Sequence, residues 1–219
     1  TGCVDETKVA LTIGTTGAMR VLSEGPAPDV PTGLWAYRLG SNRTLLGGSF
    51  SEGGNVVQWA LDNLKLPPIG QLNSELEKLK PAQHGINVLP FIAGERATGW
   101  STSATGVLEG VRISTTPIEI LQAMLESVSY RFAMVADLLL PGVKSGYQMI
   151  ASGGAIQNSP WWLQTMCDVL GVPVGVSAEQ QDTSRGTAVL ALNALGVWDS
   201  LETHHADIAE TYEPNSTNA

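Results

Sequence analysis

The stretch ASGGAIQNSPWWLQTMCDVLGVPV, Ala151–Val174, shows how this chain alternates between strand and helix. An apolar run at Tyr147–Ser152 predicts a strand, and Pro160–Leu170 has the apolar spacing of a helix. A second strand is predicted at Val172–Ser177. The two glycines between the first strand and the helix favour either a tight turn that brings the helix close to the sheet or a place where a ligand touches the main chain.

A long helix is predicted just before this stretch, from Pro117 to Leu140. Thr116 is a good N-cap, Pro117 suits the first helical position, and Pro141-Gly142 ends the pattern. Its apolar face repeats at helical spacing and consists of Ile118, Leu121, Leu125, Val128, Phe132, Val135 and Leu139.

The rest of the chain places strands first and then alternates helices with strands. This order predicts an α/β fold, a mixed sheet with helices packed on its faces, in one domain over residues 1–219. The other predicted segments are strands at Lys8–Gly14, Ala18–Ser23, Gly33–Gly40 and Arg43–Ser49, extended segments at Ile86–Gly94 and Thr105–Ser114, helices at Gly54–Leu66, Ile69–Lys80 and Thr183–Leu195, and a polar, frayed tail at Glu210–Ala219.

Composition excludes several classes of protein. Hydrophobic residues make up 43% of the 219 residues and charged residues 15%, which supports a packed core and argues against disorder. The net charge is −9 and the Lys and Arg residues are scattered, so no nucleic-acid partner is expected. Two cysteines, Cys3 and Cys167, have no metal-type spacing. With polar first residues and no apolar run of about 18 residues, we expect a cytoplasmic protein without a membrane span.

Three glycine-bearing turns are candidates for ligand contact. Between the first two strands, Gly14-Thr15-Thr16-Gly17 offers N–H groups and hydroxyls to phosphate oxygens, or forms a plain hairpin turn. At the start of the next helix, Gly53-Gly54 offers unpaired N–H groups that favour an anion, with Gln58 one turn further on. The alternative for that second site is a flexible helix entry with an exposed Gln.

The third turn contains Gly153 and Gly154. Their backbone can approach a flat ring or a phosphate closely, and Asn158 either shares that ligand or caps the following helix. Cys167 is expected to be a small buried residue and not a nucleophile. The residues expected in the core behind this turn are Trp161, Trp162, Leu163 and Met166.

Other polar residues point to no particular chemistry. His84 lies next to a glycine and is expected on a surface loop. Glu95 and Arg96 form an ion pair, contact a site, or do neither. Asp168 and Asp182 have no evident metal partners, and no Ser-His-Asp arrangement can be read from the spacing.

The sequence resembles the C-terminal half of the FGGY carbohydrate kinases over roughly Lys8–Trp198. Three segments match the family in order: FIAGERATGW, the adenosine segment ASGGAIQNSPWWLQTMCDVLGVPV, and QDTSRGTAVLALNALG in the closing helix. The most specific match is GVLEGVRISTTPIEILQAMLES, which is similar to the family's second signature. Its matching residues are Gly106, Leu108, Gly110, Val111, Glu119, Ala123, Met124, Leu125 and Glu126.

The resemblance implies an actin-like fold, in which two ribonuclease H-like domains face each other across a cleft and ATP lies mostly on the second domain. This chain would be that second domain, and the N-terminal sugar-binding domain would be absent from it. Carried over onto this sequence, the residues expected to contact ATP or ADP are Thr15 at the β- and γ-phosphates, with Gly14 and Thr16 beside it, Gly54 and Gln58 along the nucleotide, Gly154 and Gly153 against the adenosine, and Asn158 near the base.

The resemblance also implies phosphoryl transfer from Mg-ATP to a sugar hydroxyl. The family's catalytic base, an aspartate in an Asp-Gly or Asp-Gln motif, would fall upstream of Thr1, and the Mg²⁺-binding aspartate and most sugar contacts belong to the first domain. This chain alone is therefore expected to be inactive. Gluconate is the favoured acceptor, with xylulose or another pentulose or polyol next. The alternative is a non-catalytic actin-like module that binds nucleotide for regulation or assembly. A homodimer is a further option for this chain.

Overall fold

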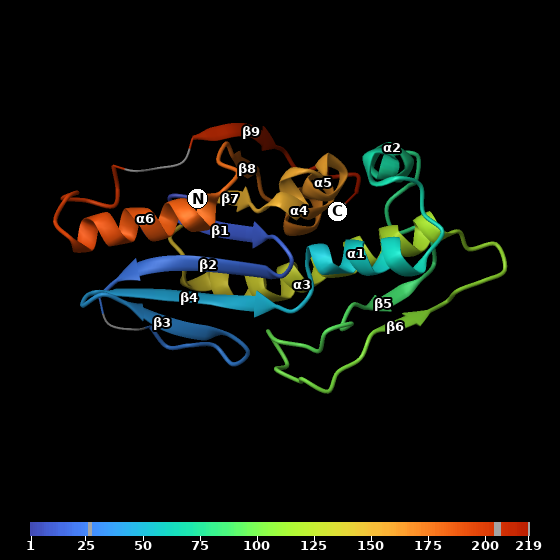
Figure 1. Ribbon diagram of the computed structural model, residues 1–219. Coiled ribbons are helices and arrows are strands. Elements are labelled where there is room, and N and C mark those ends of the chain that lie inside the picture. Colours follow the sequence, from blue (N-terminus) through green and yellow to red (C-terminus); the bar gives the residue numbers. More distant parts are fainter. Residues whose placement is uncertain (26–27, 204–206, 219) are drawn as a thin grey trace.

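The computed structural model describes residues 1–25, 28–203 and 207–218 (Figure 1). Its strands are β1 Lys8–Ile13, β2 Gly17–Glu24, β3 Trp35–Leu39, β4 Arg43–Phe50, β5 Asn87–Leu89, β6 Val107–Glu109, β7 Gln148–Ser152, β8 Val174–Ser177 and β9 Ile208–Tyr212. Within the described residues, seven of these form one mixed sheet in the order β3-β4-β2-β1-β7-β8-β9, and β5 pairs with β6 apart from it.

The sheet changes from antiparallel to parallel at β1. On one side β1 pairs antiparallel with β2, and β2 pairs antiparallel with β4. On the other side β1 runs parallel to β7, with Val9 opposite Met149. Strands β1, β4 and β7 therefore point the same way, and the turns that follow them lie at one edge of the sheet.

The helices are α1 Gly54–Asn63, α2 Leu72–Leu76, α3 Pro117–Leu139, α4 Gly154–Gln157, α5 Pro160–Leu170 and α6 Asp182–Ala194, with 3₁₀ turns η1 Ile69–Gln71 and η2 Leu140–Gly142. In Figure 1, α3 lies behind the sheet and α6 lies on the other side of it. Within the described residues, no helix combines the length and apolarity needed to span a membrane.

Helix α3 organises the core on its face of the sheet. A capping box starts it, because Thr116 N donates to Glu119 Oε2 at 2.7 Å and Glu119 N donates to Thr116 Oγ1 at 3.4 Å. Phe132 from α3 packs on Phe50 from β4 with ring centroids 4.3 Å apart. The same cluster takes side chains from α1, α2 and α5, so the predicted long helix and its apolar face are confirmed.

Two predictions in polar segments were wrong. The segment predicted as a helix at Ile69–Lys80 is an η1 turn followed by the five residues of α2. Leu72 and Leu76 are the residues that it buries, and none of residues 77–80 is buried, so no apolar face extends the helix beyond Leu76. The tail predicted to fray contains the end of β9, where Tyr212 pairs with Val174 of β8. As an edge strand, β9 exposes most of its residues, so its sequence lacks the apolar run that marks an inner strand.

Candidate functional site

The turn after β1 is hydrogen-bonded to the start of α1. Gly54 N donates to Gly14 O at 2.7 Å, and Asn55 N donates to Thr15 O at 3.1 Å. Gly53, the N-cap, donates its N–H to Asn55 Oδ1 at 2.9 Å. The expectation of unpaired N–H groups for an anion at Gly53-Gly54 was therefore wrong, because the neighbouring turn and a side chain already accept these hydrogen bonds.

The turn after β7 packs against the same place. A Cβ atom added at Gly153 would lie 2.5 Å from Ile13 O, and Gly153 has a φ of +98°. A Cβ added at Gly54 would lie 2.8 Å from Ala155 Cβ and 2.7 Å from Gly14 O. The three predicted turns are thus in contact, and Gly54 and Gly153 are required by this close packing.

Gly14 and Gly154 differ from the other glycines of the site. Within the described residues, no heavy atom outside the adjacent chain lies within 4 Å of a Cβ placed at Gly14. At Gly154 the nearest one is Asn158 Nδ2 at 3.8 Å. Neither glycine has the positive φ that would exclude a side chain. The fold therefore leaves room for a methyl group at both positions, and the bare backbone there is open to a ligand.

A cavity of about 230 Å³ lies beside these turns, between α1, α2, α3 and α5. Its walls are mostly apolar, and amide and hydroxyl groups stand among them, as in many small-molecule sites. The predicted residues Gly54, Gln58, Gly154 and Asn158 line it, together with Val57, Leu61, Ile69, Leu72, Asn73, Leu76, Leu121, Leu125, Ala155, Ser159 and Trp162. Thr15 and Thr16 are exposed in the adjoining turn and do not line it.

The polar groups around the cavity bond to one another. Asn158 Nδ2 donates to Gly154 O at 2.7 Å, and Gln58 Nε2 donates to Asp62 Oδ1 at 2.8 Å. Asn73 of α2 reaches across, where its Nδ2 donates to Asn158 O at 3.1 Å and its Oδ1 accepts from Ser159 Oγ at 3.0 Å. Asn158 does not cap α5, because Pro160 begins that helix and Ser159 takes the N-cap position. Asn158 instead ends α4.

The tryptophans behind the turn are core residues, as predicted. Trp162 is fully buried, and its Nε1–H donates to Leu125 O at 3.1 Å and to Ser129 Oγ at 3.2 Å, which fixes α5 on α3. Because Trp162 also lines the cavity, one residue serves both the core and the site. Cys167 is fully buried, and burial together with Asp168 raises the pKa of its thiol to about 11. It is an inert core residue, as predicted.

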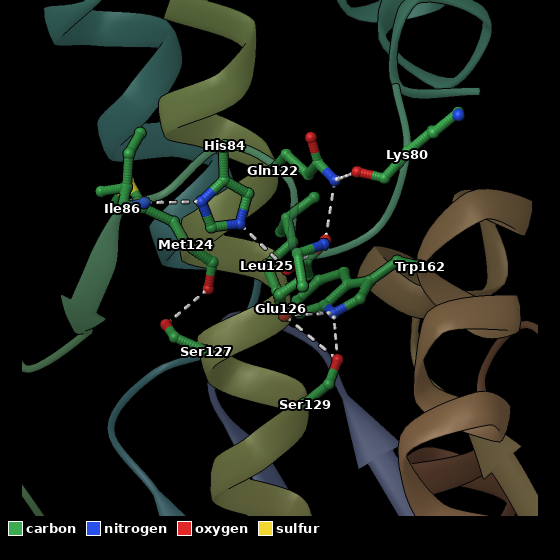
Figure 2. A network of polar contacts seen from close by, with 11 residues as sticks. Lys80, His84, Ile86, Gln122, Met124, Leu125, Glu126, Ser127, Ser129 and Trp162 are labelled. Carbon is green, nitrogen blue, oxygen red and sulfur yellow. Dashed lines mark hydrogen bonds and ion pairs between the residues drawn. The ribbon is translucent and has the colours of Figure 1, made fainter. Parts of the chain in front are cut away.

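His84 was expected on a surface loop, and this was wrong. Its side chain is 7% exposed, and its Nε2 lies 3.0 Å from Glu126 Oε2 in the middle of α3 (Figure 2). Glu126 is itself 3% exposed. A carboxylate so deep in an apolar helix face requires partners, and this was the sequence signal that could have pointed to His84.

A second buried ionic group surrounds Arg131 of α3. Arg131 donates to Glu95 Oε1, and its Nε lies 3.5 Å from Glu52 Oε1. Burial raises the pKa of Glu52 above its usual value. Glu95 therefore pairs with Arg131, and not with its neighbour Arg96 as one of the alternatives held. This group fastens the loop before β6 to α3.

Of the two aspartates considered for metal binding, Asp168 has other hydrogen-bond partners. Asp168 accepts hydrogen bonds from Gln164 Nε2 at 2.7 Å and from Asn215 N at 2.8 Å, which holds the C-terminal segment on α5. Asp182 begins α6. Across residues 1–25, 28–203 and 207–218, no three His, Cys, Asp or Glu side chains are grouped so as to hold a metal ion.

Comparison with known proteins gives consistent results. Residues 9–195 match the FGGY family of carbohydrate kinases, C-terminal domain. The chain is similar to a gluconokinase of Bacillus licheniformis, with 28% identity over 94% of this chain and 42% of that protein. It is also similar to a glycerol kinase of Methylobacterium nodulans, with 33% identity over 85% of this chain and 39% of that protein. The chain thus spans about two fifths of the length of these relatives.

Solved structures show the same relationship. A gluconate kinase from Lactobacillus acidophilus matches with a TM-score of 0.84 and 27% identity, over 99% of this chain and 44% of that one. A ligand-bound xylulose kinase from the same organism matches with a TM-score of 0.85 and 27% identity, over the same shares of the two chains. The α/β fold expected from the sequence is therefore the fold that these kinases have in the corresponding part of their chains.

Proposed function

The chain belongs to the FGGY family of carbohydrate kinases, whose C-terminal domain it matches, and on this premise we propose that it is the nucleotide-binding domain of an ATP-dependent carbohydrate kinase. The acceptor would be the hydroxyl of a sugar or sugar acid. Gluconate is our first choice, because gluconate kinases are among the relatives both by sequence and by structure. Xylulose and glycerol are next for the same kind of reason.

One observation carries the proposal: the open backbone at Gly14 and Gly154 lies beside a mostly apolar cavity at the edge where three turns meet. A purine ring fits apolar walls such as Leu121 and Leu125, with amide groups near its polar edge. We place the adenosine against the backbone of Gly154, with the amide of Asn158 near the base and Gln58 along the nucleotide.

The phosphates would extend from the cavity toward the exposed turn after β1. Thr15 and Thr16 offer two hydroxyls there, and Gly14 lets the phosphate chain approach the backbone. The N–H groups that start α1 hold the turn in place by their bonds to Gly14 O and Thr15 O. We therefore assign α1 the task of orienting the turn and not of binding the anion directly.

Catalysis would need groups in addition to those of the nucleotide cavity. Mg²⁺ bound with ATP would neutralise charge on the phosphates, and it commonly keeps several waters and uses only one or two protein carboxylates. We propose that this chain's part is to hold and orient ATP or ADP. We propose that an aspartate base and the sugar contacts lie outside this chain, and that the kinase uses ATP in the cytoplasm.

Isothermal titration of the chain with ADP tests the proposal. We expect binding that weakens roughly tenfold or more in Gly154→Val, because the added methyl groups would occupy the place of the adenosine, and tenfold corresponds to about 1.4 kcal/mol. Gly142→Val is the matched control, since Gly142 also has open space around it but lies in η2, away from the cavity.

Two outcomes would count against it. If the chain does not bind ADP at millimolar concentration, the nucleotide assignment fails. If Gly154→Val and Gly142→Val bind ADP equally well, Gly154 does not contact the nucleotide. Melting curves of both variants establish that they are folded.

A further inference from the structure

A carboxylate in the middle of α3 holds the segment that connects α2 to β5 (Figure 2). Glu126 is 3% exposed, and its two oxygens accept the N–H of Ala82 at 3.2 and 3.3 Å. Oε2 also accepts from His84 Nε2 at 3.0 Å, and Oε1 accepts from Gln122 Nε2 at 2.7 Å. One buried charge thus collects four donor contacts from two parts of the chain, the charge-assisted kind of hydrogen bond that is the strongest.

The donors around Glu126 are fixed in their roles. Ile86 N donates to His84 Nδ1 at 3.0 Å, so the ring carries its proton on Nε2 and donates it to the carboxylate. Gln122 Nε2 also donates to Lys80 O at 2.9 Å, so its amide cannot turn round without placing one oxygen against another. Residues 80–86 are therefore tied to α3 at Lys80, Ala82 and His84.

The tied segment leads directly back into the wall of the cavity. Leu72, Asn73 and Leu76 of α2 line the cavity on one side. A helix of five residues is not stable by itself, so its position depends on what holds its ends. Within α2, Asn73 bonds to Asn158 and Ser159. After α2, the chain is bonded to Glu126 at Ala82.

Helix α3, which carries Glu126, also forms the floor of the cavity. Leu121 and Leu125 line the cavity from α3 and flank Gln122 and Glu126 in the sequence. Trp162 of α5, which also lines the cavity, donates to Leu125 O. One short stretch of α3, residues 121–129, thus holds both the segment that follows α2 and Trp162 of α5.

We propose that Glu126 is a positioning residue for nucleotide binding: it holds residues 80–86 on α3 so that α2 forms the second wall of the nucleotide cavity. This inference rests on the proposed function. Glu126 does not line the cavity itself, so it acts through α2. Within the FGGY resemblance it is the last acidic residue of the second signature, and the structure explains an acid there by the donors that surround it.

Glu126→Gln tests the inference with almost no change of shape. Both oxygens of Glu126 accept hydrogen bonds, so the new amide nitrogen would face either the Nε2–H of His84 or the donors of Ala82 and Gln122. We expect about tenfold weaker ADP binding by calorimetry and faster hydrogen exchange of the amides of residues 72–86. Exchange in β1 and β7 should not change. Saturating ADP should restore the protection of residues 72–86, which a defect elsewhere in the fold would not show.

Ser127→Ala is the matched control. Ser127 is the next residue of α3, is buried, and donates to Met124 O at 2.8 Å within its own helix, so its loss leaves residues 80–86 tied. This variant should bind ADP as the parent does. If Glu126→Gln does not fold, Gln122→Met removes one tie to the segment and should weaken ADP binding about threefold.

The outcomes separate the two proposals. If the parent chain does not bind ADP, the proposed function and this inference both fail. If the parent binds ADP and Glu126→Gln, or Gln122→Met in its place, binds it equally well, this inference fails alone. Equal weakening in Ser127→Ala would also overturn it, because the effect would then belong to α3 in general.

Discussion

At the scale of single residues, glycine has two distinct uses in this site. Gly53, Gly54 and Gly153 are glycines because backbone atoms of a neighbouring turn lie within 3 Å of the Cβ position. Gly14 and Gly154 have no such neighbour. The first set builds the site, and we infer that the second set is kept bare for the ligand. This distinction makes Gly154 the informative position for mutation.

Cys167 provides a prediction about reactivity. Its Sγ–H donates to Val172 O and Tyr212 O, both at 3.2 Å, and its pKa is raised to about 11 by burial and by the nearby Asp168. The thiolate is the reactive form, so the folded chain at pH 8 should leave Cys167 unlabelled by a thiol reagent such as DTNB. Labelling is followed by mass spectrometry of the digested protein.

Two controls define that result. Guanidinium unfolding should make Cys167 react at the rate of an ordinary thiol, because an unfolded cysteine has a pKa near 8.5. The sign of the pH effect on stability follows from the same shift. The folded state keeps the thiol neutral, so this stabilisation is complete below about pH 8.5 and is lost as the pH rises toward 11. Rapid labelling of native Cys167 at pH 8 would contradict the burial.

At the scale of elements, α3 contacts more parts of the fold than its sequence pattern indicates. It packs on the sheet through Phe132, holds α5 through Trp162, and fastens two loops through Arg131 and Glu126. Its start is set locally by Thr116, Pro117 and Glu119. The local signals explain why its bounds were predictable, whereas its polar contacts depend on segments more than 30 residues away.

Thr116→Ala should lower the free energy of unfolding by about 1 kcal/mol, within a range of about 0.5–2, because it removes the side chain that caps α3. Urea unfolding at pH 7 measures this change. Thr105→Ala, at an exposed position in the loop before β6, should change stability by less than about 0.5 kcal/mol. Equal stability of the two variants would show that the capping box does not hold α3.

The same cap has a predictable pH dependence. Hydrogen bonds from the backbone and side chain of Thr116 lower the pKa of Glu119 below its usual value. The contribution of Glu119 is therefore present above the pKa of an unfolded glutamate, about 4.3, and is lost as the pH falls through the lowered value. The stability difference between the parent chain and Thr116→Ala should shrink in that acidic range.

At the scale of the whole molecule, the candidate site is assembled from segments that are far apart in the chain. Residues 14–16, 53–58 and 153–158 meet because β1, β4 and β7 end at the same edge of the sheet. Residues 72–76 and 121–125 then supply the outer wall and the floor of the cavity. No single segment forms a cavity by itself, and the cavity exists only when all of these segments are in place.

Hydrogen exchange with and without ADP tests this convergence. If one nucleotide binds where we propose, saturating ADP should slow amide exchange at residues 14–16, 54–58 and 153–158 together, with a common dependence on ADP concentration. No residue of the paired strands β5 and β6 lines the cavity, so amide exchange in these strands should be unaffected. Protection of one turn without the other two would mean that the three turns do not share a ligand.

Local sequence patterns were enough to predict both N-terminal hairpins, the helices α1, α3, α5 and α6, and the three glycine turns, because these depend on apolar periodicity, caps and turn residues within about ten positions. Tertiary structure decided the rest. It shortened the polar helix at Ile69–Lys80, paired β9 with β8, buried His84 beside Glu126, and separated Gly14 and Gly154 from the glycines that packing requires. Those outcomes depend on which distant atoms lie within a few ångströms. A local pattern can show that a residue such as Glu126 needs partners, but it does not show which distant residues supply them.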